Sequence, residues 1–186
     1  MSDNTEKKEP VKPFRFMFGC LMASLNIKNW KKLHTMIAPE DIYGTREEGF
    51  GKETEPHVTI LFGFDPQEKG TLERLKAELP IDGPIEVPLV KLSFFENKDF
   101  DVLKFDVEST DLAKLNAWCR ENFKYQSDHP EYHAHVTLCY LKKGLGKKYA
   151  RNMSEPVVTT AETLIYSEPT AEGKLRTKWK VEKGAN

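Results

Sequence analysis

The chain has 186 residues and a formal net charge of −1 at pH 7, and 39% of its residues are hydrophobic. This length suits one domain with a core of its own, so disulfides and structural metals are not needed for folding. The balanced charge gives no global positive field, which counts mildly against long nucleic acids as partners, and any anionic ligand must be held by local groups. Cys20, Cys119 and Cys139 are far apart and odd in number, which argues against a disulfide framework or a zinc ribbon.

The chain begins with polar and charged residues, unlike a signal or transit peptide. No apolar run approaches the roughly 20 residues of a membrane span. We therefore expect a cytoplasmic protein with no membrane partner. Residues 1–13 are predicted to form a mobile tail and residues 14–182 a single domain. The sequence carries no signal for an oligomeric state.

Hydrophobic periodicity predicts the elements of the first half of the chain. In chain order they are a strand at Phe14–Leu25, a short helix with Trp30, Leu33 and Ile37 on one face, a loop at 39–55, a strand at Pro56–Phe64 and a helix at 66–79. The loop is acidic, contains three glycines and lacks periodicity. We expect it to be mobile and to close over a ligand.

The second half is predicted to alternate strands with one helix. In order, these are antiparallel strands at Ile85–Phe95 and Phe100–Val107, a helix at 111–123 with Thr110 as N-cap, a strand at Tyr132–Leu141, a basic stretch at Lys142–Arg151, and strands near Val157–Tyr166 and Lys174–Val181. Basic residues alternate along the last strand, which predicts a solvated basic face and an apolar inner face. The mixture indicates an α+β fold.

Two of the predicted strands begin with the same short motif. Residues 56–61 read Pro-His-Val-Thr-Ile-Leu, and residues 134–139 read Ala-His-Val-Thr-Leu-Cys. Side chains alternate between the two faces of a strand, so His57 and Thr59 share one face, and His135 and Thr137 share another. The valines and the residues after the threonines then face the core.

A pair of imidazoles and a pair of hydroxyls suit phosphodiester chemistry. An imidazole with a pKa of about 6.5 can exist in either protonation state at neutral pH, so two of them can act as general base and general acid. The threonine hydroxyls can donate hydrogen bonds to phosphate oxygens. This arrangement needs no metal and no cofactor.

Two simpler interpretations compete with this one. A single His-Val-Thr strand is ordinary β-sequence with a half-buried histidine, but two copies in matching positions favour a shared role. His133 and His135 have a spacing that also suits zinc. No Asp or Glu accompanies them at ligand spacing, so we expect no metal and treat His133 as an exposed residue.

Paired His-x-Thr motifs, each followed by an apolar residue, resemble the signature of the 2H phosphoesterase superfamily. The matching residues are His57, Thr59, His135 and Thr137, with Ile60 and Leu138 in the apolar slots. The resemblance implies a bilobal α+β fold in which antiparallel sheets line a central cleft and helices pack outside. It also implies that the four residues are catalytic.

A closer resemblance concerns Gly19–Met22, Pro39–Tyr43 and above all Glu55–Gly63, which are similar to the phage anti-CBASS 2H phosphoesterases. This resemblance implies a metal-independent phosphodiesterase that cleaves 3′–5′ bonds of cyclic di- or trinucleotides in the host cytoplasm. Phe62 departs from the tyrosine expected in many relatives. Two alternatives stay open: a 2H enzyme acting on RNA ends, and a non-catalytic module that binds cyclic nucleotides.

A nucleotide site needs aromatic side chains that stack on bases. The candidates for substrate binding are Phe18, Tyr43, Tyr140, Tyr166 and Trp179, together with Glu168, which could hold a base edge or a ribose hydroxyl. Tyr43 is the first choice among them, because it lies in the glycine-containing loop before the first motif.

Overall fold

The computed structural model describes residues 17–81, 83–170 and 176–181. The predicted tail at 1–13, the first residues of the predicted strand at Phe14–Leu25, and Lys174 and Leu175 of the last predicted strand lie outside the described residues.

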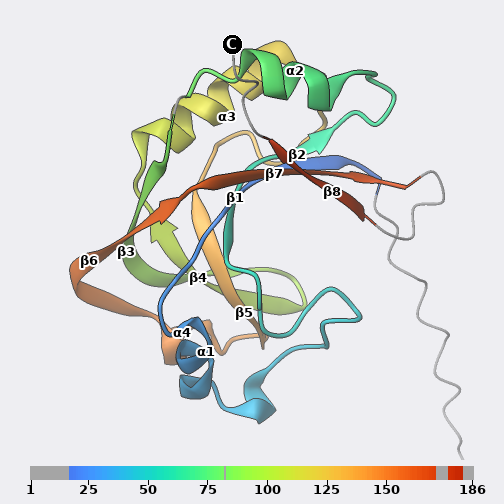
Figure 1. Ribbon diagram of the computed structural model, residues 1–186. Coiled ribbons are helices and arrows are strands. Elements are labelled where there is room, and N and C mark those ends of the chain that lie inside the picture. The colour runs from blue at the N-terminus through green and yellow to red at the C-terminus, as the bar shows by residue number, and fades with distance from the viewer. Residues whose placement is uncertain (1–16, 82, 171–175, 182–186) are drawn as a thin grey trace, which may run out of the picture.

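The described residues form eight strands, whose arrangement Figure 1 shows. They are β1 (Gly19–Ser24), β2 (His57–Phe64), β3 (Ile85–Glu96), β4 (Phe100–Val107), β5 (His135–Lys142), β6 (Arg151–Ala161), β7 (Thr163–Pro169) and β8 (Arg176–Val181). All of them belong to one antiparallel sheet with the order β6-β3-β4-β5-β2-β1-β7-β8. The predicted α+β class with antiparallel pairing is confirmed.

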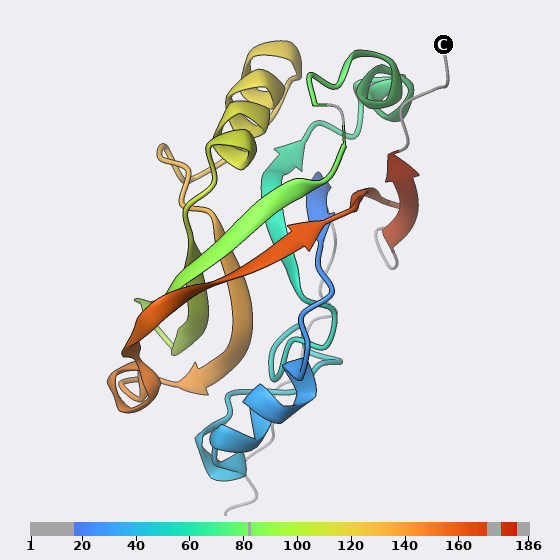
Figure 2. The ribbon, with the colours of Figure 1, turned by 60° about the vertical axis from the view of Figure 1, so that its left-hand side comes forward.

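The sheet has two matching halves that meet at β2 and β5. These two strands pair through a single residue pair, Val58 with Val136. Moving outward, β1 and β4 are next, followed by β7 and β3, and then by β8 and β6. The strand predicted near Val157–Tyr166 is the nearly continuous run of β6 and β7, which passes from one half to the other across the molecule (Figures 1 and 2).

The helices are short and lie near the two ends of the strands (Figure 2). They are α1 (Trp30–Leu33), the 3-10 turns η1 (His34–Met36) and η2 (Pro39–Asp41), α2 (Thr71–Glu78), α3 (Thr110–Asn122) and α4 (Gly146–Tyr149). The predicted N-cap of α3 is wrong by one residue. Ser109, in extended conformation, accepts a hydrogen bond from the Leu112 amide, and Thr110 is already helical.

The apolar face of each motif strand lies in the core, as the alternation predicts. Val58, Ile60, Val136 and Leu138 are fully buried. The side chains of α3 at Leu112, Leu115 and Cys119 are also fully buried and belong to the same cluster. The three cysteines are buried thiols that pack as small apolar residues. No helix within the described ranges is both long and apolar enough to cross a membrane.

Candidate active site

The two His-x-Thr pairs meet at the junction of the halves. The antiparallel pairing of Val58 with Val136, extended by one residue in each direction, places His57 opposite Thr137 and Thr59 opposite His135. Val58 and Val136 face the core, so the other four side chains share the opposite face. The two imidazoles therefore occupy one diagonal of a small rectangle, and the two threonines occupy the other.

The two motif strands also share an irregularity that the alternation does not predict. In both, the third residue is followed by two consecutive buried residues, Ile60 and Leu61 in β2 and Leu138 and Cys139 in β5. The register with the neighbouring strands shifts at the same positions. Such a bulge moves the following side chain to the other face. As a result, the aromatic residue five positions after each histidine, Phe62 or Tyr140, returns to the face of the histidines.

Both imidazoles are held in the same way. The Nδ1 atom of His57 lies 2.8 Å from the carbonyl oxygen of Glu55, and that of His135 lies 2.7 Å from the carbonyl oxygen of His133. A carbonyl oxygen can only accept a hydrogen bond, so Nδ1 carries the proton in each ring. The Nε2 atom of each ring is then left for chemistry. A neutral ring can accept a proton there, and a protonated ring can donate one.

The surroundings of His135 favour its neutral form. Its pKa is lowered, mainly because burial disfavours the charged imidazolium, and further because the charges of Lys104 and His57 repel a proton. The hydrogen bond to the His133 carbonyl and the carboxylate of Asp106 act in the opposite direction. The interaction with His57 also indicates that the two rings are close enough to influence each other.

The described part of the chain contains no set of ligands for a metal ion. Across residues 17–81, 83–170 and 176–181, no three His, Cys, Asp or Glu side chains are grouped so that they could hold a metal ion. The side chain of His133 is 67% exposed and pairs with Glu131 at 3.4 Å, so the expectation that no carboxylate accompanies the two histidines is wrong. The expectation of an exposed His133 is confirmed, and the metal-free mechanism stays a prediction.

An aromatic cluster surrounds Tyr140 at one end of the motif face. The rings of Tyr43, Phe50, Phe100 and Tyr140 contact one another, with centroids 5.0–5.6 Å apart. A small pocket of about 170 Å³ lies beside it, and it is lined by the rings of Phe50 and Tyr140, the cations Arg46 and Lys52, the carboxylate of Glu53, and Gly49. Two cations beside two aromatic rings form a suitable place for a base and its phosphate.

At the other end, Phe62 takes the position that Tyr140 has in the second half. Its side chain is 47% exposed, and its ring meets that of Phe18 edge to face at 6.2 Å. Lys178 on β8 lies in line with Phe62 across the sheet. The register runs from Lys178 to Ser167 on β7, then to Cys20 on β1 and finally to Phe62 on β2. The Lys178 Nζ atom is 2.8 Å from a carboxylate oxygen of Glu55. The basic face of the last strand is therefore the face that carries His57.

Three of the predicted substrate-binding residues lie elsewhere. Tyr166 is 1% exposed, and its ring packs against Phe64 and Trp179. A ring buried in this way cannot stack on a base, so its predicted role is wrong. Trp179 pairs with Tyr166 on the same face of the sheet and packs against the core. Glu168 accepts a hydrogen bond of 3.5 Å from the Tyr166 hydroxyl and also lies on that face, away from His57.

The loop before the first motif is anchored to β5. The amides of Tyr43 and Glu53 donate to the carbonyls of Tyr140 and Leu138, and the Tyr140 amide donates to the Gly51 carbonyl. The loop occupies the space where β2 and β5 diverge after their single pair. These bonds favour mobility in the exposed turn at 44–49 over mobility of the whole loop, and closure over a ligand stays a prediction.

Hydrogen exchange should reflect this anchoring. We expect slow exchange at the amides of Tyr43, Gly51 and Glu53 in the free protein, because each is bonded to a backbone carbonyl. A non-hydrolysable cyclic dinucleotide should add protection mainly within 44–49. Uniformly fast exchange over 42–53 in the free protein, followed by protection with ligand, would instead support a lid made of the whole loop.

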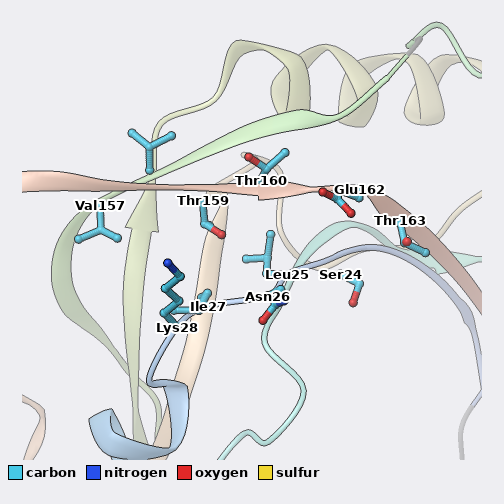
Figure 3. Close-up of a pocket in the computed structure, with 11 residues that line it drawn as sticks. Ser24, Leu25, Asn26, Ile27, Lys28, Val157, Thr159, Thr160, Glu162 and Thr163 are labelled. Atoms are coloured by element: carbon cyan, nitrogen blue, oxygen red, sulfur yellow. The ribbon is translucent and has the colours of Figure 1, made fainter.

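A separate cavity of about 570 Å³ lies between the end of β1 and the β6–β7 strand. Figure 3 shows its walls, which include Lys28, Val157, Thr159 and Glu162. Neither histidine of the motifs and neither motif threonine lines it. It is therefore not the space in which the four residues would act together.

These features define a two-histidine phosphoesterase architecture. Residues 30–164 match the family model of the 2′-5′ RNA ligase superfamily, and the chain belongs to this family, the 2H phosphoesterases. No curated protein matches the chain in sequence.

Solved structures support the fold. The chain is similar to TT0787 of Thermus thermophilus, with 14% identity, a TM-score of 0.53 and coverage of 91% of this chain and 100% of the other. It is also similar to E. coli LigT complexed with 3′-AMP, with 12% identity, a TM-score of 0.55 and coverage of 92% and 97%. A protein described as a phosphoesterase matches at 13% identity and a TM-score of 0.52, over 92% of this chain and 100% of that one.

Three residues near the motifs were not predicted from the sequence: Lys104, Phe50 and Phe100. Lys104 interrupts an otherwise apolar run in β4 and is only 5% exposed, and a lysine inside a strand of this kind is an available signal. Phe50 and Phe100 join the cluster through a loop and a strand end, and no spacing in the sequence relates them to Tyr140.

Proposed function

We propose that this 2H phosphoesterase cleaves the 3′–5′ bonds of cyclic di- or trinucleotides, with His57 and His135 as acid–base pair. The observation that carries the proposal is the arrangement of two His and two Thr side chains on one face, with both imidazoles tethered through Nδ1. The phage anti-CBASS enzymes degrade the cyclic oligonucleotide messengers of CBASS, a bacterial defence system. The resemblance to them supports a cyclic substrate and a role in countering that immunity.

The proposed reaction has two steps. In the first, one imidazole takes the proton of a ribose 2′-hydroxyl, the 2′-oxygen bonds to phosphorus, the bond to the 5′-oxygen breaks, and the other imidazole protonates that oxygen. A 2′,3′-cyclic phosphate results. In the second step, water attacks phosphorus with the proton roles exchanged, and a 3′-phosphate is left. Thr59 and Thr137 donate hydrogen bonds to the non-bridging oxygens, which carry the negative charge.

The two ends of the motif face support a substrate with a nucleoside on each side of the scissile phosphate. Phe62 with Phe18 lies at one end, and Tyr140 with Phe50 lies at the other. Each end has cations nearby, Lys178 at the first and Arg46 and Lys52 at the second. Stacking on an aromatic ring contributes about 1–3 kcal/mol per base, so two such ends favour a dinucleotide unit over a single nucleotide.

An enzyme acting on RNA ends is the second candidate. It is favoured by the family itself and by the similarity to LigT, whose structure holds 3′-AMP. The net charge of −1 gives no electrostatic advantage to a long polyanion. The third candidate, a module that only binds cyclic nucleotides, needs neither of the tethered imidazoles.

One assay separates the three candidates. The protein is incubated with cyclic dinucleotides, cyclic trinucleotides, RNA with a 2′,3′-cyclic phosphate end and a 2′-5′ linked dinucleotide, and the products are resolved by mass. We expect linear products from the cyclic oligonucleotides at the highest kcat/KM. Turnover confined to the RNA ends would favour the second candidate, and tight binding without turnover would favour the third.

Activity should survive an excess of EDTA. The expectation rests on the tethered imidazoles, each of which presents Nε2 as a proton acceptor or donor. The measurement is kcat in EDTA. His133→Ala is a companion variant, which removes the imidazole that would accompany His135 in a metal site. Loss of turnover in EDTA that zinc or manganese restores, together with inactivity of the His133 variant, would establish a metal site.

A further inference from the structure

The two halves of the site have matching geometry but different neighbours. In the second half, β4 places Lys104 opposite Thr137 and Asp106 opposite His135. In the first half, β1 places Met22 opposite Thr59 and Ser24 opposite His57. A charged pair in one half therefore corresponds to an uncharged pair in the other.

Lys104 is buried beside His135 and is held in place by three neighbouring side chains. Only 5% of the residue is exposed, and its Nζ atom donates to the Ser93 hydroxyl at 2.8 Å and to the Asp106 carboxylate. The same Nζ atom lies 4.1 Å from the centre of the Phe95 ring, and that ring meets the His135 ring edge to face at 5.0 Å. A buried lysine held by three groups is a fixed positive charge next to the imidazole.

The other charged groups around His135 do not cancel this charge. Asp106 is shared with Lys104 and Ser93, and its effect on the proton of His135 is smaller than that of Lys104. Lys91 on β3 lies opposite Asp106 in the strand register. It adds a second, exposed cation on that side. From β2, His57 is a further group that repels a proton. The preceding segment contributes Glu131, which pairs with the exposed side chain of His133.

The neighbourhood of His57 has the opposite character. Glu55 offers its carbonyl to Nδ1 of His57, and its carboxylate is close enough for the two groups to attract each other. The pKa of this carboxyl is lowered, first by the hydrogen bond and charge of Lys178 and then, to a smaller extent, by Arg46 and His57. The first half of the site thus places a carboxylate beside its histidine, whereas the second half places a lysine beside its own.

We propose that His135 is the general base of the first step and His57 the general acid, and that Lys104 is a positioning residue that adds to the burial of the His135 ring in favouring its neutral form. This inference rests on the proposed phosphodiester cleavage. At a given pH the general base must be unprotonated while the general acid is protonated. Two matched histidines meet this condition efficiently only if their surroundings differ. The burial of His135 and the charge of Lys104 provide that inequality in the second half.

Titration of the histidines by NMR tests the role of Lys104 without any substrate. Lys104→Met copies the residue that the first half has at the matching position, and Lys104→Met/Asp106→Ser copies both residues and leaves no unpaired carboxylate. We expect the pKa of His135 to rise in the single variant and to rise less in the double variant, which also loses the Asp106 charge. Lys114→Met on the exposed face of α3 is the control. A pKa of His135 that does not move in the folded variants overturns the role of Lys104.

The assignment of base and acid is tested with a better leaving group. A nucleoside 3′-(4-nitrophenyl phosphate) releases nitrophenolate, which needs no proton from a general acid. His57→Ala should lose about 10²–10⁴ in kcat on a natural diester but recover most of the wild-type rate on the nitrophenyl substrate. His135→Ala should stay inactive on both substrates. The reverse pattern, or equal recovery of both variants, overturns the assignment.

The two tests also separate this inference from the proposed function. If the wild-type protein cleaves no ribonucleotide diester, the proposed function fails and the assignment of base and acid fails with it. The titration still decides whether Lys104 controls the proton of His135. If the wild-type protein cleaves cyclic oligonucleotides and His57→Ala recovers on the nitrophenyl substrate, both the function and the assignment hold.

Discussion

Replacing either histidine by alanine should reduce kcat by about 10²–10⁴, because each ring performs one of the two proton transfers. The double variant should lose less than the product of the two single losses, since the rings act together on one phosphate. Thr59→Val and Thr137→Val keep the side-chain shape and remove only a hydroxyl, so their losses should be smaller. The measurement is steady-state turnover of the best substrate from the panel.

The controls for these variants are folding and a histidine outside the pair. Thermal unfolding should be close to that of the wild-type protein, because both imidazoles lie on the half-buried face of their strands and not in the core. His129→Ala removes an exposed imidazole and should leave kcat unchanged. Near-normal turnover by folded His135→Ala on every nucleotide tested would refute the two-histidine mechanism.

Gly63→Ala should be the most destabilising small substitution near the site. The backbone of Gly63 has φ of +109°, and an added Cβ would lie 1.9 Å from the carbonyl oxygen of Gln126. Gly63 also accepts a hydrogen bond of 2.9 Å from the Gln126 amide, so the two segments cannot separate without losing it. We expect a loss of about 3 kcal/mol or more in the free energy of unfolding, and a Tm about 6–12 °C lower.

Gly70→Ala separates the two causes of this loss. Gly70 also has a positive φ, +78°, but nothing lies within 4 Å of a Cβ added there. Its cost should therefore be limited to the left-handed conformation, about 1–2 kcal/mol. Calorimetry of both variants measures the difference, and equal losses at the two glycines would contradict the predicted clash with Gln126.

The sequence was most informative where a local pattern decides the structure. Alternation in the two His-Val-Thr strands was enough to place the valines in the core and the imidazoles on the other face, and the family model agrees with the class that the motifs indicate. The helix at 111–123 and the antiparallel pair around Asn97 followed from periodicity in the same way.

The sequence was least informative where pairing between distant segments decides the structure. The bulges after Thr59 and Thr137 turn Phe62 and Tyr140 toward the histidines, and simple alternation places these rings on the other face. Tyr166 was predicted at the site although its strand buries it, because an aromatic residue in a strand has the same local pattern in a core and in a cleft. The anchoring of the loop to β5 depends on the gap that opens between β2 and β5.

The chemical end groups of the first product test the central claim most directly. A two-histidine mechanism uses the ribose 2′-hydroxyl as nucleophile, so a time course by ³¹P NMR in EDTA should show a 2′,3′-cyclic phosphate first and a 3′-phosphate later, each with a 5′-hydroxyl at the other end. A substrate with 2′-deoxyribose at the scissile position should be inert. A 5′-phosphate and a 3′-hydroxyl as first products would mean that water attacks directly, and would contradict the assigned roles of His57 and His135.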